Sequence, residues 1–285
     1  MDPLRGSIAA VAESARNVSC VGALPVAITN NLNFASPETE IGYWQLSTAC
    51  EGISIACEAL ETPVTGGNVS LYNESIDDEG NKKPIQPTPV IGMVGILDNV
   101  KQAVSSGWKN INDEIWIIGS RDSGLTLGAT SYLEYFHGQI TGRPPSLNLI
   151  DEKLCQLFIR NGILNNLIIS SHDISDGGLA IALAEACILS DKGASINLID
   201  DKRIDSLLFS EGGSRIIFSI SHMKKNEWLK FVSEESKNFT DSIYVTKIGT
   251  VLQDTLKIKI SDNIICDLKI SSLADKFNNG LSNNF

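Results

Sequence analysis

Residues 62–75 read TPVTGGNVSLYNES, and the interpretation of the whole chain starts from this stretch. Polar and apolar side chains alternate after the glycine pair, and an alternation of two is the period of a β-strand. We therefore expect Asn68 and Ser70 to share one face of a strand, while Val69 and Leu71 face a core. The polar face would carry an amide and a hydroxyl side by side.

The pair Gly66-Gly67 is expected just before this strand, where missing side chains allow a close approach to the backbone. Together with the amide and the hydroxyl, the bare backbone suits a phosphate or a metal-bound nucleotide. A surface strand that follows a tight Gly-Gly turn is the structural alternative. The motif alone leaves both interpretations open.

Composition limits the classes of protein that this chain can represent. Its 285 residues are 42% hydrophobic, which is typical of a soluble globular chain with one large domain or two ordinary ones. The net charge is −11 and no basic run stands out, which argues against a nucleic-acid surface. No apolar run is long enough for a membrane helix, and the N-terminus lacks the features of a signal peptide. The six cysteines form no C-x-x-C pair, so we expect reduced, buried thiols and a cytoplasmic location.

The first hundred residues predict two helices and several strands. The opening Asp-Pro pair is a typical helix start. Residues 24–29, LPVAIT, predict a buried strand, and the amide-rich residues 30–34 are expected to lie outside it. A second helix is expected over residues 36–60, with Ile41 and Trp44 among the side chains that face inward.

The polar, irregular composition of residues 98–112 predicts a domain boundary, which divides the chain into residues 1–105 and 106–285. The second part begins with the buried strand 114–119, EIWIIG. Strands and helices then follow one another without strict βαβ repetition. We therefore expect the α+β class, with helices layered on sheets.

Three groups of residues are candidates for a functional site. The first combines residues 30–34 with residues 66–70, two strand ends that we expect to meet at one rim; asparagines that cap their own turns are the alternative. The second is HDISDGG at 172–178, where the start of a helix favours an anion, although Asp and Ser caps explain it equally well. His172 and Asp173 are not expected to form a catalytic dyad, because neighbours on a strand point to opposite faces.

The third group is FSEGGSR at 209–215, between two apolar runs. One interpretation is a glycine turn that exposes Glu211 and Arg215. We interpret the stretch first as a hairpin or bulge and second as a site. The chain contains no phosphate-binding loop, dinucleotide fingerprint, nucleophile elbow or metalloprotease helix. From residue chemistry alone, the conclusion is an α+β protein with a candidate anion or nucleotide rim.

Four blocks in order resemble a known family: DPLRGSIAAVAESARNVSCVGALPVAITNNLNF, YWQLSTACEGISIACEALETPVTGGNVSLYNES, PTPVIGMVGIL and SSHDISDGGLAIALAEA. They are similar to the synthetase subunits of phosphoribosylformylglycinamidine synthases, within the aminoimidazole ribonucleotide synthetase superfamily. The resemblance covers residues 2–215, and the last seventy residues match only in general character. It implies two domains of that superfamily, an N-type domain without its first strands and a C-type domain.

The resemblance implies a reaction of purine biosynthesis in which formylglycinamide ribonucleotide, ATP and ammonia give the amidine, ADP and phosphate. In the family, ATP activates the amide oxygen and ammonia displaces the resulting phosphate. Ammonia comes from a glutaminase subunit, and a small accessory subunit completes the complex. The implied cofactors are ATP and Mg²⁺, and neither nucleic acid nor membrane is an implied partner.

The resemblance also implies roles for four residues. Gly67 matches a backbone contact to ATP, Asn68 a magnesium ligand and Ser70 a contact to the ribonucleotide. Asn30 matches a position that is typically Asp and contacts ATP. The Asn at this position keeps hydrogen-bonding capacity but removes a negative charge.

The chain resembles only the C-terminal half of the family's subunit. The catalytic histidine and most acidic magnesium ligands belong to the other half, so no catalytic residue is expected here. We expect a complementary N-terminal half as a partner and no activity without it. The alternatives are a non-catalytic assembly module, an inactive fragment, or another superfamily enzyme such as a selenophosphate synthetase or thiamine phosphate kinase.

Overall fold

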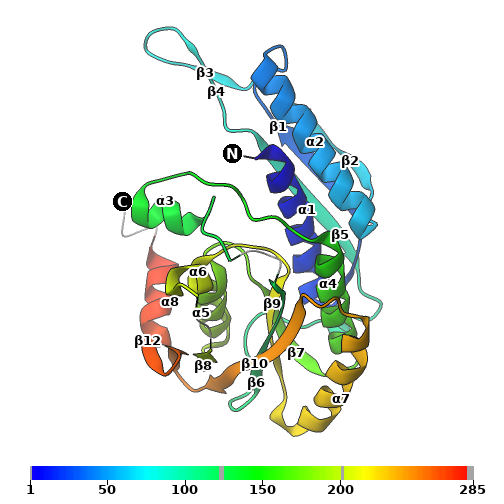
Figure 1. The fold of residues 1–285 in the computed structure, drawn as a ribbon, viewed down its shortest axis with the longest axis vertical. Helices are drawn as coiled ribbons and strands as arrows, with labels where there is room; N and C mark the ends of the chain where they lie inside the picture. The colour runs from blue at the N-terminus through cyan, green and yellow to red at the C-terminus, as the bar shows by residue number, and fades with distance from the viewer. Residues whose placement is uncertain (1, 122–124, 200–201, 281–285) are drawn as a thin grey trace.

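The computed structural model describes residues 2–121, 125–199 and 202–280. Within these residues, a three-stranded sheet lies in the N-terminal part and a seven-stranded sheet in the C-terminal part, each with helices packed on it (Figure 1). A small hairpin extends from the N-terminal part, away from both sheets (Figure 1). No helix in the described residues is long and apolar enough to cross a membrane.

The N-terminal sheet has the strand order β2-β1-β5, with β2 parallel and β5 antiparallel to β1. Its elements are α1 (Pro3–Cys20), β1 (Leu24–Asn33), α2 (Glu40–Leu60), β2 (Val64–Ser70) and β5 (Thr88–Ile96), and the hairpin consists of β3 (Glu74–Ile76) and β4 (Lys82–Pro84). The Asp2 side chain caps α1 by accepting a hydrogen bond from the backbone N–H of Arg5, as the Asp-Pro start predicts. Both long helices pack on one face of the sheet, where Val11, Ile28 and Ile53 are buried.

The opposite face of this sheet is not covered by any described residue of the chain, and this overturns two expectations. The amide-rich residues 30–33 lie inside β1, because a strand with one open face accommodates polar side chains at every second position. Leu32 is buried on the helix side, whereas Asn31 is exposed on the other. The pair Gly66-Gly67 likewise lies within β2 and does not precede it.

The expected core positions on β2 and α2 are only partly correct. Leu71 packs against the core, but Val69 is 56% exposed because β2 is an edge strand. Helix α2 begins at Glu40 and is capped by Thr39, so the predicted start at residue 36 was too early. Ile41 and Trp44, in the first turns of α2, are 69% and 51% exposed and do not face inward.

The C-terminal sheet has the strand order β12-β11-β8-β10-β6-β9-β7. Its strands are β6 (Glu114–Ser120), β7 (Ile168–Asp173), β8 (Gly193–Leu198), β9 (Arg215–Ile220), β10 (Ile243–Leu252), β11 (Thr255–Ile260) and β12 (Asn263–Lys269). The helices are α3 (Ser131–His137), α4 (Leu149–Leu164), α5 (Gly178–Ser190), α6 (Ile204–Phe209), α7 (Lys225–Glu235) and α8 (Ile270–Asn279), with short 3₁₀ turns η1 (Val100–Gln102), η3 (His222–Lys224) and η4 (Ser236–Asn238).

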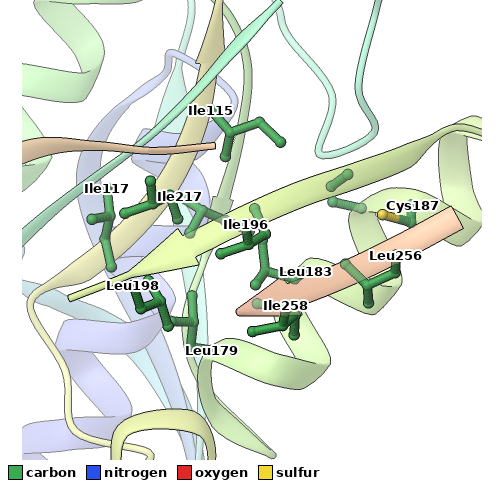
Figure 2. Packing of buried hydrophobic residues seen from close by; sticks show 14 of the residues in the cluster. Ile115, Ile117, Leu179, Leu183, Cys187, Ile196, Leu198, Ile217, Leu256 and Ile258 are labelled. Atoms are coloured by element: carbon green, nitrogen blue, oxygen red, sulfur yellow. The ribbon is translucent and has the colours of Figure 1, made fainter. Parts of the chain in front are cut away.

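Helices cover both faces of the large sheet, which explains the apolar run of residues 115–119 in β6. Ile115 and Ile117 point into a core closed by α5, α6 and α8, part of which is drawn in Figure 2. Trp116 and Ile118 point into a second core closed by α4 and α7. The predicted α+β class, with helices layered on sheets, is confirmed.

A buried ion pair joins the two parts of the chain. Arg16 on α1 donates to Glu152 on α4, with Nη1 and Oε1 separated by 2.9 Å, and both side chains are almost fully buried. Glu152 also accepts hydrogen bonds from the backbone N–H and the hydroxyl of Ser214. Burial lowers the pKa of Arg16, but the carboxylates of Glu152 and Asp173 outweigh it and raise that pKa.

The domain boundary between residues 105 and 106 stays a prediction.

Candidate functional site

The register between β1 and β2 determines where the four predicted residues lie. Asn30 is paired with Gly67, and Asn31 with Asn68. Paired residues on parallel strands project to the same side of a sheet, and successive residues alternate. Asn68 and Ser70 therefore project from the open face of the sheet, whereas the Asn30 side chain projects from the helix face. Gly67, the partner of Asn30, has no side chain on that face.

Glycine is required at position 67 because the Asn30 amide lies directly against it. A Cβ atom at Gly67 would lie 2.2 Å from Asn30 Oδ1 and 2.3 Å from the Asn30 carbonyl oxygen. Gly66, in contrast, has no atom within 4 Å of that position. The two glycines of the motif thus differ: the first is free of steric constraint and the second is not.

Asn30 also lines a hollow of about 520 Å³ between the C-terminal half of α2 and the start of β2. Cys50, Ser54 and Glu58 of α2 line its other side, and the Ser54 hydroxyl donates to Glu58. Reasoning from the sequence missed this α2 wall. Its polar residues follow helical spacing on a helix that we treated only as core.

Asn68 is oriented by a neighbour that the sequence reasoning did not single out. Its Nδ2 donates to Asn31 Oδ1 across the strand pair, at 3.2 Å. Within the described residues its amide oxygen accepts no hydrogen bond, so that oxygen is available to a ligand. The alternation of β1 was the available signal, because Asn31 and not Asn30 shares a face with Asn68.

Ser70 lies where β2 ends, and a turn holds its hydroxyl. The hydroxyl donates to Asn73 Oδ1 at 3.2 Å, and Asn73 Nδ2 donates to the Ser70 carbonyl at 2.8 Å. The same Asn73 amide reaches the carbonyl of Phe34 at 3.2 Å, which joins the ends of β1 and β2. The expected meeting of the two strand ends at one rim is therefore observed.

The four residues occupy the two faces of the strand pair formed by β1 and the edge strand β2. Asn30 and Gly67 lie on the helix side, and Asn68 and Ser70 on the open side. Because β2 has only one neighbour among the described strands, its outer edge is accessible from both sides. A ligand that runs along this edge can contact both pairs, and unpaired backbone groups of an edge strand add donors and acceptors.

The residues present suit one position in a magnesium site. Magnesium prefers oxygen ligands, keeps several waters and is completed by substrate phosphates, so one neutral amide oxygen from Asn68 fits such a site. Among the described residues, no group of three or more His, Cys, Asp and Glu side chains could hold a metal ion by itself.

Comparison with protein families accounts for both parts of the chain. Residues 1–97 match the AIR synthase related protein, N-terminal domain, and residues 110–255 match the corresponding C-terminal domain. The chain belongs to the AIR synthase-related family. The predicted domain boundary falls between the two matched ranges.

Curated relatives of this AIR synthase-related chain confirm the resemblance found in the sequence. The chain is 67% identical over its whole length to the phosphoribosylformylglycinamidine synthase subunit PurL of Prochlorococcus marinus strain AS9601, and 66% identical to that of strain MIT 9301. In both cases it spans 37% of the relative's length.

Solved structures show the same fold at low sequence identity. PurL of Thermotoga maritima complexed with ATP superposes with a TM-score of 0.69 at 18% identity, over 96% of this chain and 42% of that one. The same protein complexed with FGAR gives 0.70, again at 18% identity, over 96% and 43% of the two chains. Thiamine monophosphate kinase from Aquifex aeolicus gives 0.57 at 18% identity, over 93% of this chain and 83% of that one.

The C-terminal AIR synthase-related domain corrects the expectation for His172. Its Nδ1 lies 3.3 Å from Asp173 Oδ1 and its Nε2 lies 2.9 Å from Glu185 Oε2, so the neighbours on the strand do interact. They meet because β7 ends at Asp173, where strict alternation of side chains no longer applies. Burial lowers the pKa of His172, but the hydrogen bonds to both carboxylates outweigh it and raise the pKa to about 9.

The helix start at residues 172–178, which we considered as an anion site, is occupied by the carboxylate of Glu211 from the same chain. Glu211 Oε1 accepts from the backbone N–H of Gly177, at the start of α5, and from that of Ser131, at the start of α3. The stretch 209–215 connects α6 to β9 and is not a hairpin. Arg215 is only 2% exposed, so the expectation that this loop exposes it was wrong.

Proposed function

We propose that this chain forms part of the synthetase subunit of a cytoplasmic phosphoribosylformylglycinamidine synthase, an ATP-dependent carbon–nitrogen ligase of purine biosynthesis. The complete reaction would convert formylglycinamide ribonucleotide, ATP and ammonia to the amidine, ADP and phosphate. The observation that carries the proposal is the edge strand β2, which bears Gly67, Asn68 and Ser70. The resemblance implies that these residues match the family's ATP, magnesium and substrate positions. The identity of 67% over the whole chain to a PurL subunit supports it.

In this proposal ATP lies along the outer edge of β2. The backbone at Gly67 and the amide of Asn30 contact ATP, part of which enters the hollow beside α2. The Asn68 oxygen binds Mg²⁺, which neutralises phosphate charge when bound. The Ser70 hydroxyl contacts the ribonucleotide. Asn30 at the position that is typically Asp offers both a donor and an acceptor, so it retains a hydrogen bond to the nucleotide without the charge.

The open face of the N-terminal sheet is the surface that we assign to the complementary half of the subunit. Val90 and Val94 on this face are 51% and 53% exposed, and Thr29 and Asn31 lie beside them. An apolar face of this kind is stabilised when another layer covers it. We further propose that the complex includes the glutaminase subunit, which supplies ammonia, and the small accessory subunit.

The test is amidine formation from the ribonucleotide, ATP and ammonium chloride, with and without the complementary half. We expect turnover only with both halves. In the reconstituted enzyme, Asn68→Leu should abolish turnover and Ser70→Ala should raise the KM for the ribonucleotide. Ser75→Ala is the matched control, because the Ser75 hydroxyl donates to the Lys83 carbonyl within the hairpin, away from the assigned site.

Binding of a non-hydrolysable ATP analogue to the same samples separates the alternatives. If the reconstituted halves bind the analogue but Asn68→Leu leaves turnover unchanged, the assigned site is wrong. If they neither turn over nor bind nucleotide, the enzyme assignment fails and a non-catalytic assembly module remains.

A further inference from the structure

A second cavity lies in the C-terminal sheet, where two neighbouring strands separate. Strand β10 pairs with β8 only between Gly249 and Leu252, while its earlier residues pair with β6 alone. The end of β8 continues beside β11. The resulting fork encloses a cavity of about 610 Å³, lined by Asn197 and Leu198 on one side and residues 244–248 on the other.

A cross-strand row forms the inner wall of this cavity. Arg215 on β9, Gly119 on β6 and Tyr244 on β10 are aligned across three neighbouring strands. A Cβ atom at Gly119 would lie 2.8 Å from the Tyr244 hydroxyl and 3.0 Å from Arg215 Cγ. Glycine in the middle of the row therefore leaves room for the Arg215 side-chain stem and the Tyr244 phenol to pack over its backbone.

Arg215 is a buried cation whose hydrogen bonds go to neutral groups. Its Nη2 donates to the Ser210 carbonyl and its Nε to that of Gly212. No carboxylate among the described residues forms an ion pair with it, unlike Arg16, which contacts Glu152. Burial, the largest effect, lowers the pKa of Arg215 to about 10. A buried charge without a counter-charge is unfavourable, and an anion placed beside it removes that cost.

The mouth of the cavity carries further positive charge. Arg121 and Lys202 line it and are exposed. Among the described residues that line the cavity there is no Asp or Glu, although the whole chain has a net charge of −11. The described part of the lining is therefore positively charged, and positive charge attracts anions.

The inner surface of the same cavity is apolar. Ile117, Leu179 and Leu198 line it and also belong to the core drawn in Figure 2, so the pocket opens onto the end of that core. Ligand sites commonly combine such an apolar wall with a few convergent polar groups. The combination selects for a molecule with an anionic group and an apolar body.

We propose that the fork between β8 and β10 is a binding site for a small organic anion. A phosphate or carboxylate group is held by Arg215, Tyr244 and the cations at the mouth, and the apolar body of the ligand packs on Ile117 and Leu179. This site lies in the C-terminal domain and does not depend on the proposed ligase activity.

The test is calorimetric titration of the 285-residue chain with phenyl phosphate and phenylacetate, which distinguish the two anionic groups. Benzyl alcohol and inorganic phosphate test the contributions of charge and of the apolar body. We expect saturable one-to-one binding of at least one aromatic anion, and much weaker binding of benzyl alcohol and of inorganic phosphate. Raising the salt concentration should weaken it.

Substitutions of cavity residues test whether the anion binds in this cavity. Arg121→Gln with Lys202→Gln removes two exposed charges and should weaken binding by about tenfold, because each contributes a modest electrostatic attraction. Lys230→Gln, which removes an exposed charge on α7 outside the cavity, is the control. Tyr244→Phe tests the inner wall without removing the buried Arg215, so an unfolded variant does not obscure the result.

The proposal is overturned if neither aromatic anion binds at millimolar concentration, or if benzyl alcohol binds as tightly as they do. It is also overturned if the double variant and Lys230→Gln weaken binding equally.

Discussion

The buried pair between Arg16 and Glu152 should be a main determinant of how firmly the two parts of the chain hold together. Arg16→Met keeps most of the side-chain volume and removes only the charge and its hydrogen bonds. Breaking a buried pair by removing one partner generally costs about 3–5 kcal/mol, since the other charge stays buried. Glu152 retains three donors, the Ser214 N–H and hydroxyl and the Gln156 amide, so we expect about 3 kcal/mol.

Lys153, the residue after Glu152 on α4, provides a matched control. Lys153 Nζ lies 2.9 Å from Glu61 Oε1, the same separation as in the buried pair, but both side chains are exposed. Lys153→Met should therefore cost at most about 1 kcal/mol. Urea unfolding of both variants, followed by tryptophan fluorescence and far-UV circular dichroism, measures the difference.

A double variant tests the cause directly. Arg16→Met combined with Glu152→Gln removes both charges, and it should be more stable than Arg16→Met alone because no unpaired carboxylate remains buried. Equal losses in Arg16→Met and Lys153→Met would refute the reasoning. So would a double variant whose loss is the sum of the two single losses.

Three further predictions concern individual contacts. Gly67→Ala should disrupt the pairing of β2 with Asn30 and cost about 1–3 kcal/mol in urea unfolding, whereas Gly66→Ala should be nearly neutral; equal effects would contradict the steric argument. The raised pKa of His172 implies a stabilisation that is complete below pH 6.5 and is lost as the pH rises through about 9. Unfolding free energies between pH 6 and 10 should fall more steeply for the unmodified chain than for His172→Gln, and parallel curves would exclude the ion pair as the cause. Glu211→Ala should cost about 1–2 kcal/mol by leaving two helix-start N–H groups without their acceptor, and unchanged hydrogen exchange at those amides would argue against it.

Local patterns in the sequence determined most of the secondary structure. The Asp-Pro start predicted α1, and residues 114–119, EIWIIG, predicted a buried strand. The alternation after Gly67 correctly placed Asn68 and Ser70 on one face of β2. These features depend on backbone propensity and on side-chain periodicity, which a few neighbouring residues specify.

Only the tertiary structure decided which faces are covered and which charges are buried. The sequence does not show that β2 is an edge strand, which leaves Val69 exposed, or that the register of β1 and β2 places Asn31, not Asn30, beside Asn68. It also does not show that Trp44, in the first turns of α2, is exposed. Nor does it show that Arg215 is buried at a fork between strands. These outcomes follow from contacts between residues far apart in the chain, because burial depends on what packs against an element and not on the element's own period.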